Sequence, residues 1–304
     1  MTHFKSWLTA GWAVLALHLG VVEGQCQAPF RAGLEIESGY RTDTIQEGIQ
    51  FIDHSHMIPY SSIERQLKDL SSIQLGGRGF LEVSDWVVKA NGHYGWIVNG
   101  EYNADHIEKG RQRGHNIDAS TAIGYLYKKI DCFNIAPLVG YSYDQLVARA
   151  QHVRALHPTM NTINTQNGTW SAKVFGPWFG VDIYYDATEW CRNMYFISGY
   201  EFHCGQAFTH WNETLCEPKG SKFSFTTKQA HMIGHVVRFE SQIIIWDNWF
   251  AGFDTLYKYW GSTHNSRSRF GQGVDSGLAS TQKQDVFKLN WYCFALTLNL
   301  GRVF

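Results

Sequence analysis

Closely spaced histidines are the side chains in this sequence with the clearest capacity to bind a metal ion. His54 and His56 lie two residues apart with Asp53 beside them, and His231 and His235 lie four residues apart. On a strand the second pair shares one face, which we expect to point inward. Neither pair belongs to a C-x-x-C or H-E-x-x-H motif, whose spacing is typical of zinc sites. We therefore predict no metal site and no cofactor.

Other catalytic and binding motifs are absent from the sequence as well. It contains no glycine-rich phosphate loop, and no serine lies in a G-x-S-x-G nucleophile motif. The net charge of −1 argues against a nucleic-acid partner, which would favour a basic chain. The 12 Trp, 15 Tyr and 19 Phe residues instead favour a protein with aromatic girdles at membrane interfaces.

The six cysteines indicate an exported protein in which thiols tend to form disulfides. Cys204 and Cys216 are close in sequence, so we consider a local bridge between them. Cys293 falls inside a strand-like pattern and is expected to be a buried free thiol. Spacing alone leaves the remaining pairing open.

The N-terminal residues resemble a secretory signal peptide. Lys5 precedes an apolar run from Trp7 to Val22, and Gly24 follows at a suitable cleavage position. After residue 24 no run of 18 apolar residues occurs, which argues against a helical membrane protein. We therefore assign residues 1–24 to a signal peptide and 25–304 to a single mature domain.

The C-terminal residues alternate with a period of two. Between Tyr292 and Phe304 the even positions are mostly large and apolar, and the odd positions are small or polar. This pattern suits a strand with one face in lipid and the other in a polar lumen. A terminal Phe after such a strand resembles the assembly signal of bacterial outer-membrane barrels. The alternative is a buried edge strand of a soluble exported protein.

Ten segments show strand-like patterns, separated by gaps that alternate between long and short. Bacterial outer-membrane barrels have an even number of strands, long external loops and short periplasmic turns. The sequence therefore predicts an all-β fold, a closed ten-strand antiparallel transmembrane β-barrel with both termini in the periplasm of a bacterial cell. The predicted strands are residues 30–42, 73–83, 86–102, 118–127, 133–143, 170–185, 191–208, 229–245, 249–260 and 287–304.

The cost of charge in lipid sets the inward face of each strand. Lys or Arg at the membrane midplane costs about 2–4 kcal/mol, so the charged face must point into the lumen. In a narrow barrel such charges are expected to form paired struts rather than line a channel. The residues predicted to point inward are Arg31, Glu35, Glu37, Arg41, Arg78, Glu82 and Lys89, and also His93 and Asn99.

Short motifs within this topology are similar to those of omptins, the outer-membrane proteases. They are Ala32-Gly33-Leu34, Ile123-Gly124-Tyr125, the segment from Pro137 to Tyr141, and the segment from Phe175 to Gly180. The resemblance covers nearly the whole mature chain and implies an omptin-like barrel. The six cysteines bring it closest to the omptin-like outer-membrane proteins of chlamydia-related bacteria.

The omptin resemblance implies two candidate catalytic residues, Asp105 and His210. Omptins activate a water molecule with an Asp-x-Asp pair on one external loop and an Asp-His pair on another. In this chain Asn103 and Phe208 occupy the places of the two other carboxylates. Asn cannot act as a general base and Phe cannot orient His210. We therefore expect peptide hydrolysis to be absent or very weak, with Asp105 and His210 near opposite walls of the extracellular mouth.

Four function classes follow from these expectations. The first is an outer-membrane surface barrel with a degenerate protease site, serving envelope structure, adhesion or host contact. The others are an omptin-like endopeptidase with lipopolysaccharide as activator, a small porin, and a soluble exported β protein. The expected partners are outer-membrane lipid and the barrel-assembly machinery, with a host or peptide ligand at the external loops.

Overall fold

The protein is described by a computed structural model that covers most of the chain after residue 29. The described residues are 30–53, 58–104, 107–130, 133–157, 160–187, 193–214, 222–246, 248–263, 268–272, 283–284 and 286–304. The predicted signal peptide lies outside the described residues. So do His54, His56, Cys216 and Asp105.

Thirteen strands make up the regular structure of the described chain. They are β1 (Phe30–Asp53), β2 (Ile58–Val83), β3 (Trp86–Ala104), β4 (Ile107–Tyr125), β5 (Tyr127–Ile130), β6 (Phe133–His157), β7 (Met160–Asp186), β8 (Met194–Thr214), β9 (Lys222–Trp246), β10 (Trp249–Ser262), β11 (Ser268–Gln272), β12 (Lys283–Gln284) and β13 (Val286–Val303). Among the described residues no helix is long and apolar enough to cross a membrane.

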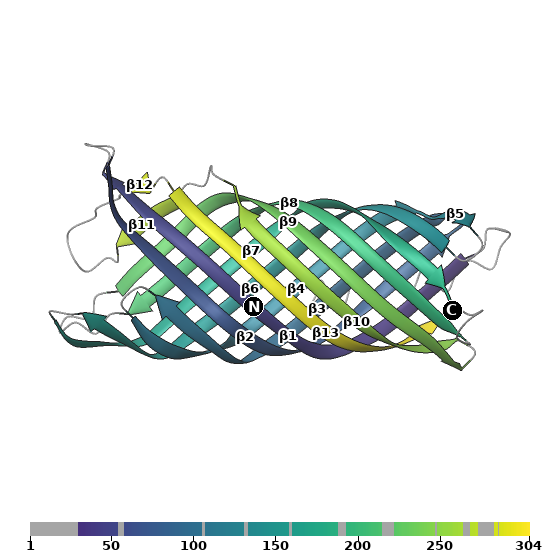
Figure 1. Ribbon diagram of the computed structural model, residues 1–304, viewed down its shortest axis with the longest axis horizontal. Helices are drawn as coiled ribbons and strands as arrows, with labels where there is room; N and C mark the ends of the chain where they lie inside the picture. Colours follow the sequence, from purple (N-terminus) through teal and green to yellow (C-terminus); the bar gives the residue numbers. More distant parts are fainter. Residues whose placement is uncertain are drawn as a thin grey trace, which may run out of the picture.

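Ten of these strands close into an antiparallel barrel (Figure 1). β1 pairs with β2 on one side and β13 on the other, and β10 closes the ring by pairing with both β13 and β9. Closure gives each of these strands two neighbours, which satisfies the backbone hydrogen bonds inside a membrane. The predicted ten-strand architecture is therefore confirmed.

The three remaining strands lie at the two ends of the barrel. β5 pairs with β6, while β11 pairs with β9 and with β12. Figure 1 places β5 at the same end as the C-terminus, and β11 and β12 at the opposite end. The short turns, such as Ser84-Asp85 between β2 and β3, lie at the end of the C-terminus. We call this the periplasmic end and the opposite one the extracellular end.

The strands extend further than the sequence pattern predicted, mainly toward the extracellular end. The predicted strands 30–42 and 73–83 continue to Asp53 and back to Ile58, with Gln50 paired to Ser62. The prediction was too short because apolar alternation ends where the strands leave lipid. The backbone ladder does not depend on that alternation and continues without it.

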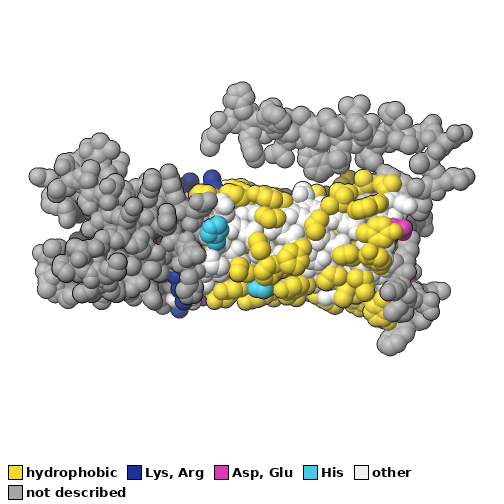
Figure 2. Space-filling model, turned by 90° about the horizontal axis from the view of Figure 1, so that it is seen from above, with side chains coloured by type: hydrophobic (Ala, Val, Ile, Leu, Met, Phe, Trp, Pro, Cys, Tyr) yellow, Lys and Arg dark blue, Asp and Glu magenta, His cyan; other side chains and the backbone are white. Residues whose placement is uncertain are grey.

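The outer wall carries an apolar belt (Figure 2). On β13 the side chains of Phe294, Leu298 and Leu300 are exposed, whereas Cys293 and Ala295 are buried. Both faces of the strand therefore match the predicted assignment of even positions to lipid and odd positions to the lumen. Lys and Arg side chains mark one border of the belt in Figure 2.

Candidate functional site

The periplasmic half of the lumen is filled with ion pairs, centred on Arg78 of β2. Its guanidinium lies 3.2 Å from a carboxylate oxygen of Glu35, 2.8 Å from Glu37, 2.5 Å from Glu240 and 2.7 Å from Asp254. Strand alternation brings Glu35 and Glu37 to one face of β1, while Asp254 and Glu240 are direct cross-strand partners on β10 and β9. One guanidinium therefore holds four carboxylates together.

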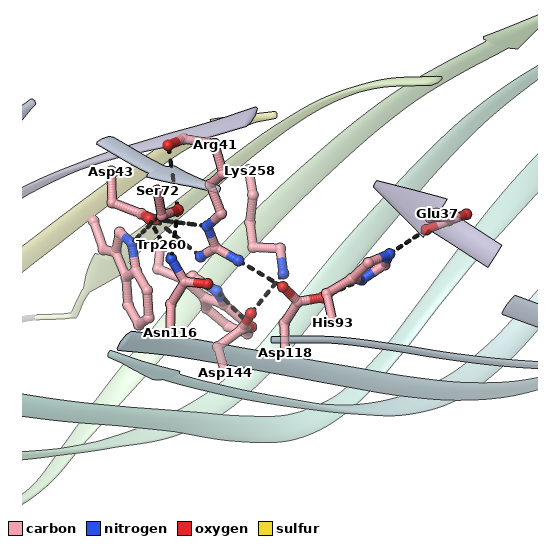
Figure 3. Close-up of polar contacts among 11 residues, drawn as sticks. Glu37, Arg41, Asp43, Ser72, His93, Asn116, Asp118, Asp144, Lys258 and Trp260 are labelled. Atoms are coloured by element: carbon pink, nitrogen blue, oxygen red, sulfur yellow. Dashed lines mark hydrogen bonds and ion pairs between the residues drawn. The ribbon is translucent and has the colours of Figure 1, made fainter. Parts of the chain in front are cut away.

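A second group of charges continues this network toward the extracellular end (Figure 3). The imidazole of His93 lies between two carboxylates, with Nε2 against Glu37 and Nδ1 3.0 Å from Asp118. Arg41 binds Asp118 at 2.6 Å and Asp43 at 2.9 Å. Moving one of these side chains would leave its partner as an uncompensated buried charge, which is costly. The paired charges therefore hold the interior of the barrel rigid.

Two lysines complete the network from other strands. Lys258 binds Asp144 at 2.6 Å, and Lys89 binds Asp182 at 2.5 Å. Asp182 also accepts a hydrogen bond from Arg238 at 3.1 Å. We refer to the whole set as the charged lumen: Glu35, Glu37, Arg41, Asp43, Arg78, Lys89, His93, Asp118, Asp144, Asp182, Arg238, Glu240, Asp254 and Lys258.

The predicted inward residues fall into three groups. Glu35, Glu37, Arg41, Arg78, Lys89 and His93 all lie in the charged lumen, as predicted. Asn99 is exposed on β3 instead, and the other two residues form a rim pair at the periplasmic end. Arg31 and Glu82 are 3.8 Å apart, with side-chain exposures of 58% and 20%.

Apolar side chains fill the lumen above the charged network. One contiguous cluster draws members from nine of the ten barrel strands, and we call it the tryptophan layer: Ile45, Leu67, Leu70, Ile97, Leu146, Ala148, Trp170, Ala172, Val174, Ala207, Met232, Trp260, Leu289 and Trp291. It lies on the extracellular side, since Ile45 follows Arg41 and Asp43 along the outgoing strand β1. The three tryptophans are at most 2% exposed, so the layer is densely packed.

Indole N–H groups connect the tryptophan layer to carboxylates. Trp291 donates to Asp43 at 2.8 Å, Trp260 to Asp144 at 3.2 Å and Trp170 to Glu47 at 3.1 Å. A buried tryptophan needs such a partner for its N–H. Sequence reasoning missed this layer because it assigned inward faces from charged side chains, although all three tryptophans lie within predicted strands. It also ended the first strand at residue 42. Extending the inward phase of Arg41 would have placed positions 45 and 47 in the lumen.

The charged lumen contains a cavity of about 50 Å³, with Arg41, Arg78, His93 and Lys258 in its wall. At roughly 10–15 Å³ for each water molecule, it holds about four. The geometry thus provides a small polar cavity below the tryptophan layer.

The two candidate catalytic residues have different positions relative to the described structure. His210 lies on β8, paired with Ser171 of β7 and Thr226 of β9, and it is exposed. Its neighbour Thr209 is buried and donates its hydroxyl hydrogen to Glu47 at 3.2 Å, so alternation turns His210 toward the outer side of the wall. Asp105 lies outside the described residues, so its approach to His210 remains a prediction.

Phe208 and Asn103, which stand where the omptin resemblance implies carboxylates, both belong to barrel strands. Phe208 stacks on Phe175 of β7, with ring centroids 5.6 Å apart and planes 10° apart. Asn103 belongs to β3, where it pairs with Gln66 of β2. Phe208 thus has an apolar partner rather than a role beside His210.

Three sequence predictions are corrected by the structure. His231 is exposed and His235 is half-buried against Tyr200 on the outer wall, because the neighbouring Arg238 and Glu240 occupy the inward phase of β9. Asn99 is also exposed, since irregular pairing between Ile97 and Glu101 shifts the phase of β3.

The cysteine predictions have mixed outcomes. Cys204 is an exposed free thiol on β8, so the predicted bridge to Cys216 is wrong. Its neighbour His203 takes the inward phase, which leaves Cys204 on the outer wall. Cys293 is a buried free thiol, as predicted. In the part of the chain that the structure describes, no group of three or more His, Cys, Asp or Glu side chains could hold a metal ion.

Comparison with known proteins agrees with this architecture. A family model described as Protochlamydia outer membrane protein matches residues 35–304. The solved structure of the outer membrane protease OmpT from Escherichia coli superimposes with a TM-score of 0.73 at 9% sequence identity, covering 93% of this chain and 99% of OmpT. At that identity the likeness shows the fold alone.

More distant barrels align loosely. OprG from Pseudomonas aeruginosa gives a TM-score of 0.36 at 11% identity, covering 90% of this chain and 96% of OprG. The toluene transporter TodX from Pseudomonas putida gives 0.35 at 9% identity, covering 90% of each chain. No curated protein matches the sequence.

Proposed function

This chain belongs to the Protochlamydia outer membrane protein family, and from that premise we propose a surface barrel that neither conducts solutes nor cleaves peptides. It is an outer-membrane β-barrel of bacteria with an omptin-like fold. Its role in this proposal is envelope structure, adhesion or contact with a host. External loops and the extracellular strand ends would carry that role, including contact with a host or peptide ligand.

The tryptophan layer is the observation that carries this proposal. A conducting porin needs a continuous polar path, whereas this cluster takes side chains from nine of the ten barrel strands and buries them almost completely. The charged lumen below adds paired charges rather than a hydrated passage. Both features favour a solid barrel over a small porin.

The proposed lack of proteolysis rests on residue chemistry at the mouth. Asn103 and Phe208 stand where the omptin resemblance implies carboxylates, and Phe208 stacks on Phe175 instead. An apolar ring at position 208 cannot orient a histidine base or polarise it as a carboxylate would. The omptin-like fold supports endopeptidase activity as the alternative, with Asp105 and His210 in the active site.

Outer-membrane lipid is the partner that the outer wall favours. Arg113 and Arg149 are direct cross-strand partners on β4 and β6, and both are exposed. Lys173 is exposed on the neighbouring strand β7. Like charges opposite one another are unfavourable unless an anion lies between them, and phosphates of lipopolysaccharide would supply it. If the barrel has any protease activity, the same lipid would be its activator.

Two measurements on the refolded full-length mature barrel test the proposal. In planar bilayers we expect no stepwise conductance; regular single-channel steps would replace the proposal with a porin. With lipopolysaccharide present, we expect no cleavage of a peptide with paired basic residues. Cleavage that is abolished by His210→Ala would establish the endopeptidase instead.

A further inference from the structure

Three lumenal side chains form a hydrogen-bonded chain outside the sites described above. The hydroxyl of Ser142 on β6 lies 3.0 Å from Nδ1 of His203 on β8, and Nε2 of the same ring lies 2.8 Å from Oε2 of Glu201. An ionised carboxylate only accepts hydrogen bonds, so Nε2 carries the proton toward Glu201. Nδ1 is then free to accept the hydroxyl hydrogen of Ser142.

The fold holds this chain in place. Glu201 and His203 are two residues apart, so they share the inward face of β8. His203 reaches Ser142 across β7, where Gly176 lies opposite Ser142 and carries no side chain. A Cβ atom at Gly176 would lie only 2.2 Å from the carbonyl oxygen of Cys204, so the close approach of β7 and β8 at this level depends on glycine.

Aromatic rings fix the orientation of the imidazole. His203 is 1% exposed, stacks on Trp178 with centroids 5.7 Å apart, and meets Trp260 edge-on at 5.0 Å. A hydroxyl, an immobilised histidine and an orienting carboxylate in this order are the arrangement that activates a serine for nucleophilic attack.

The chain also faces free space and charged side chains of both signs. Ser142, His203 and Glu201 all line the cavity of about 50 Å³, together with the cations Arg238 and Lys258 and the acids Glu37, Asp118 and Asp254. Cationic groups near the reaction centre stabilise negative charge that develops on an oxygen during acyl transfer. Space for about four water molecules limits the reacting group to a few heavy atoms.

We propose that Ser142 is a nucleophile that takes short acyl or sulfonyl groups from small electrophiles that reach the cavity from the periplasmic end, below the tryptophan layer. Oγ of Ser142 forms a bond to the carbonyl carbon or sulfonyl sulfur, while its proton passes to Nδ1 of His203. The bond to the leaving group breaks, and the leaving group departs with that proton. Glu201 is a positioning residue, which holds the ring and balances its positive charge.

Methanesulfonyl fluoride is a suitable probe for the intact refolded barrel. Attack forms an Oγ–S bond, breaks the S–F bond and releases fluoride with the proton from His203. We expect peptide mass spectrometry to find the methanesulfonyl adduct on Ser142, and Ser142→Ala to abolish it. His203→Ala should slow the reaction at least about 100-fold, as typical for loss of a general base. Should that variant fail to fold, Glu201→Gln provides the second test with a smaller loss.

Ser120 provides a matched control in the same cavity. It is the direct cross-strand partner of Ser142, and its Oγ accepts a hydrogen bond from the indole of Trp178 at 3.0 Å instead of facing a base. We expect no adduct on Ser120. The proposal is overturned if no serine reacts, if both serines react equally, or if correctly folded His203→Ala and Glu201→Gln react as fast as the unmodified chain. Heat-modifiable migration on gels reports folding for each variant.

Discussion

The charged lumen and the tryptophan layer occupy neighbouring levels of one barrel and fill it in opposite ways. In the charged lumen each group has a specific partner, such as Lys258 with Asp144 or Lys89 with Asp182. In the tryptophan layer contacts such as those of Leu70, Leu146 and Leu289 depend on shape and volume rather than on named pairs. Directional ion pairs and hydrogen bonds therefore stabilise the charged lumen, whereas close packing of apolar side chains stabilises the tryptophan layer.

The boundary between the two levels uses both kinds of interaction. Trp291 packs its ring in the upper level and donates its N–H to Asp43 in the lower one. Trp260 does the same toward Asp144, which also binds Lys258. The comparison teaches that indole N–H groups can join an apolar layer to the charged side chains below it within one barrel.

Removing the central charge should have the largest effect. Arg78→Met leaves Glu35, Glu37, Glu240 and Asp254 without their shared guanidinium, and breaking a buried network in this way costs about 3–5 kcal/mol. We expect the free energy of unfolding in lipid vesicles, measured with denaturant, to fall by this amount. Adding Glu240→Gln to Arg78→Met should recover part of the loss. If the double variant is the less stable one, the four carboxylates do not act as one network.

Truncating a boundary tryptophan should be nearly as severe for a different reason. Trp291→Ala opens a void in the tryptophan layer and removes the hydrogen bond to Asp43, so we expect a loss of about 3–5 kcal/mol. Trp291→Phe keeps most of the volume and loses only the donor, which should cost about 1–3 kcal/mol. Denaturant unfolding of both variants separates the two contributions. Equal losses would mean that packing contributes little at this position.

Placing a charge on the outer wall tests whether the lumen alone tolerates it. Leu298 is 67% exposed on β13, several residues from the periplasmic end. Leu298→Arg puts a charge into lipid and should cost about 2–4 kcal/mol near the midplane. Arg302→Leu, at the rim of the same strand, is the matched control and should change stability by about 1 kcal/mol or less. A small effect of Leu298→Arg would show that β13 lies at a different height in the membrane.

The fold and the charged lumen could be predicted from sequence because both follow from lipid. Lipid forces apolar and polar residues to alternate, and it places Glu35, Glu37 and Arg41 on the inward face of β1. This alternation no longer predicts which side chains point inward where a strand has an irregular pairing or extends beyond the lipid. The irregular pairing after Ile97 turned Asn99 outward, and Ile45 of the tryptophan layer lies beyond the predicted end of the first strand.

The Ser142, His203 and Glu201 chain could not be predicted from sequence for a related reason. Its members come from β6 and β8 and meet across β7, where Gly176 pairs with Ser142. No local motif encodes such a contact, since it depends on the register of three strands. The spacing of Glu201 and His203 by two residues was the only trace in the sequence.

Breaking the rim pair should have the smallest effect. Arg31 and Glu82 carry the same charges as the groups around Arg78, but they lie 3.8 Å apart and Arg31 is mostly exposed. Water screens such a pair, so the double variant Arg31→Ala and Glu82→Ala should change the free energy of unfolding by about 1 kcal/mol or less. Each single variant should also cost little, because the charge left behind can be hydrated. If either single variant costs as much as Arg78→Met, desolvation is not what separates the charged lumen from the rim, and the strength of the network must come from its geometry alone.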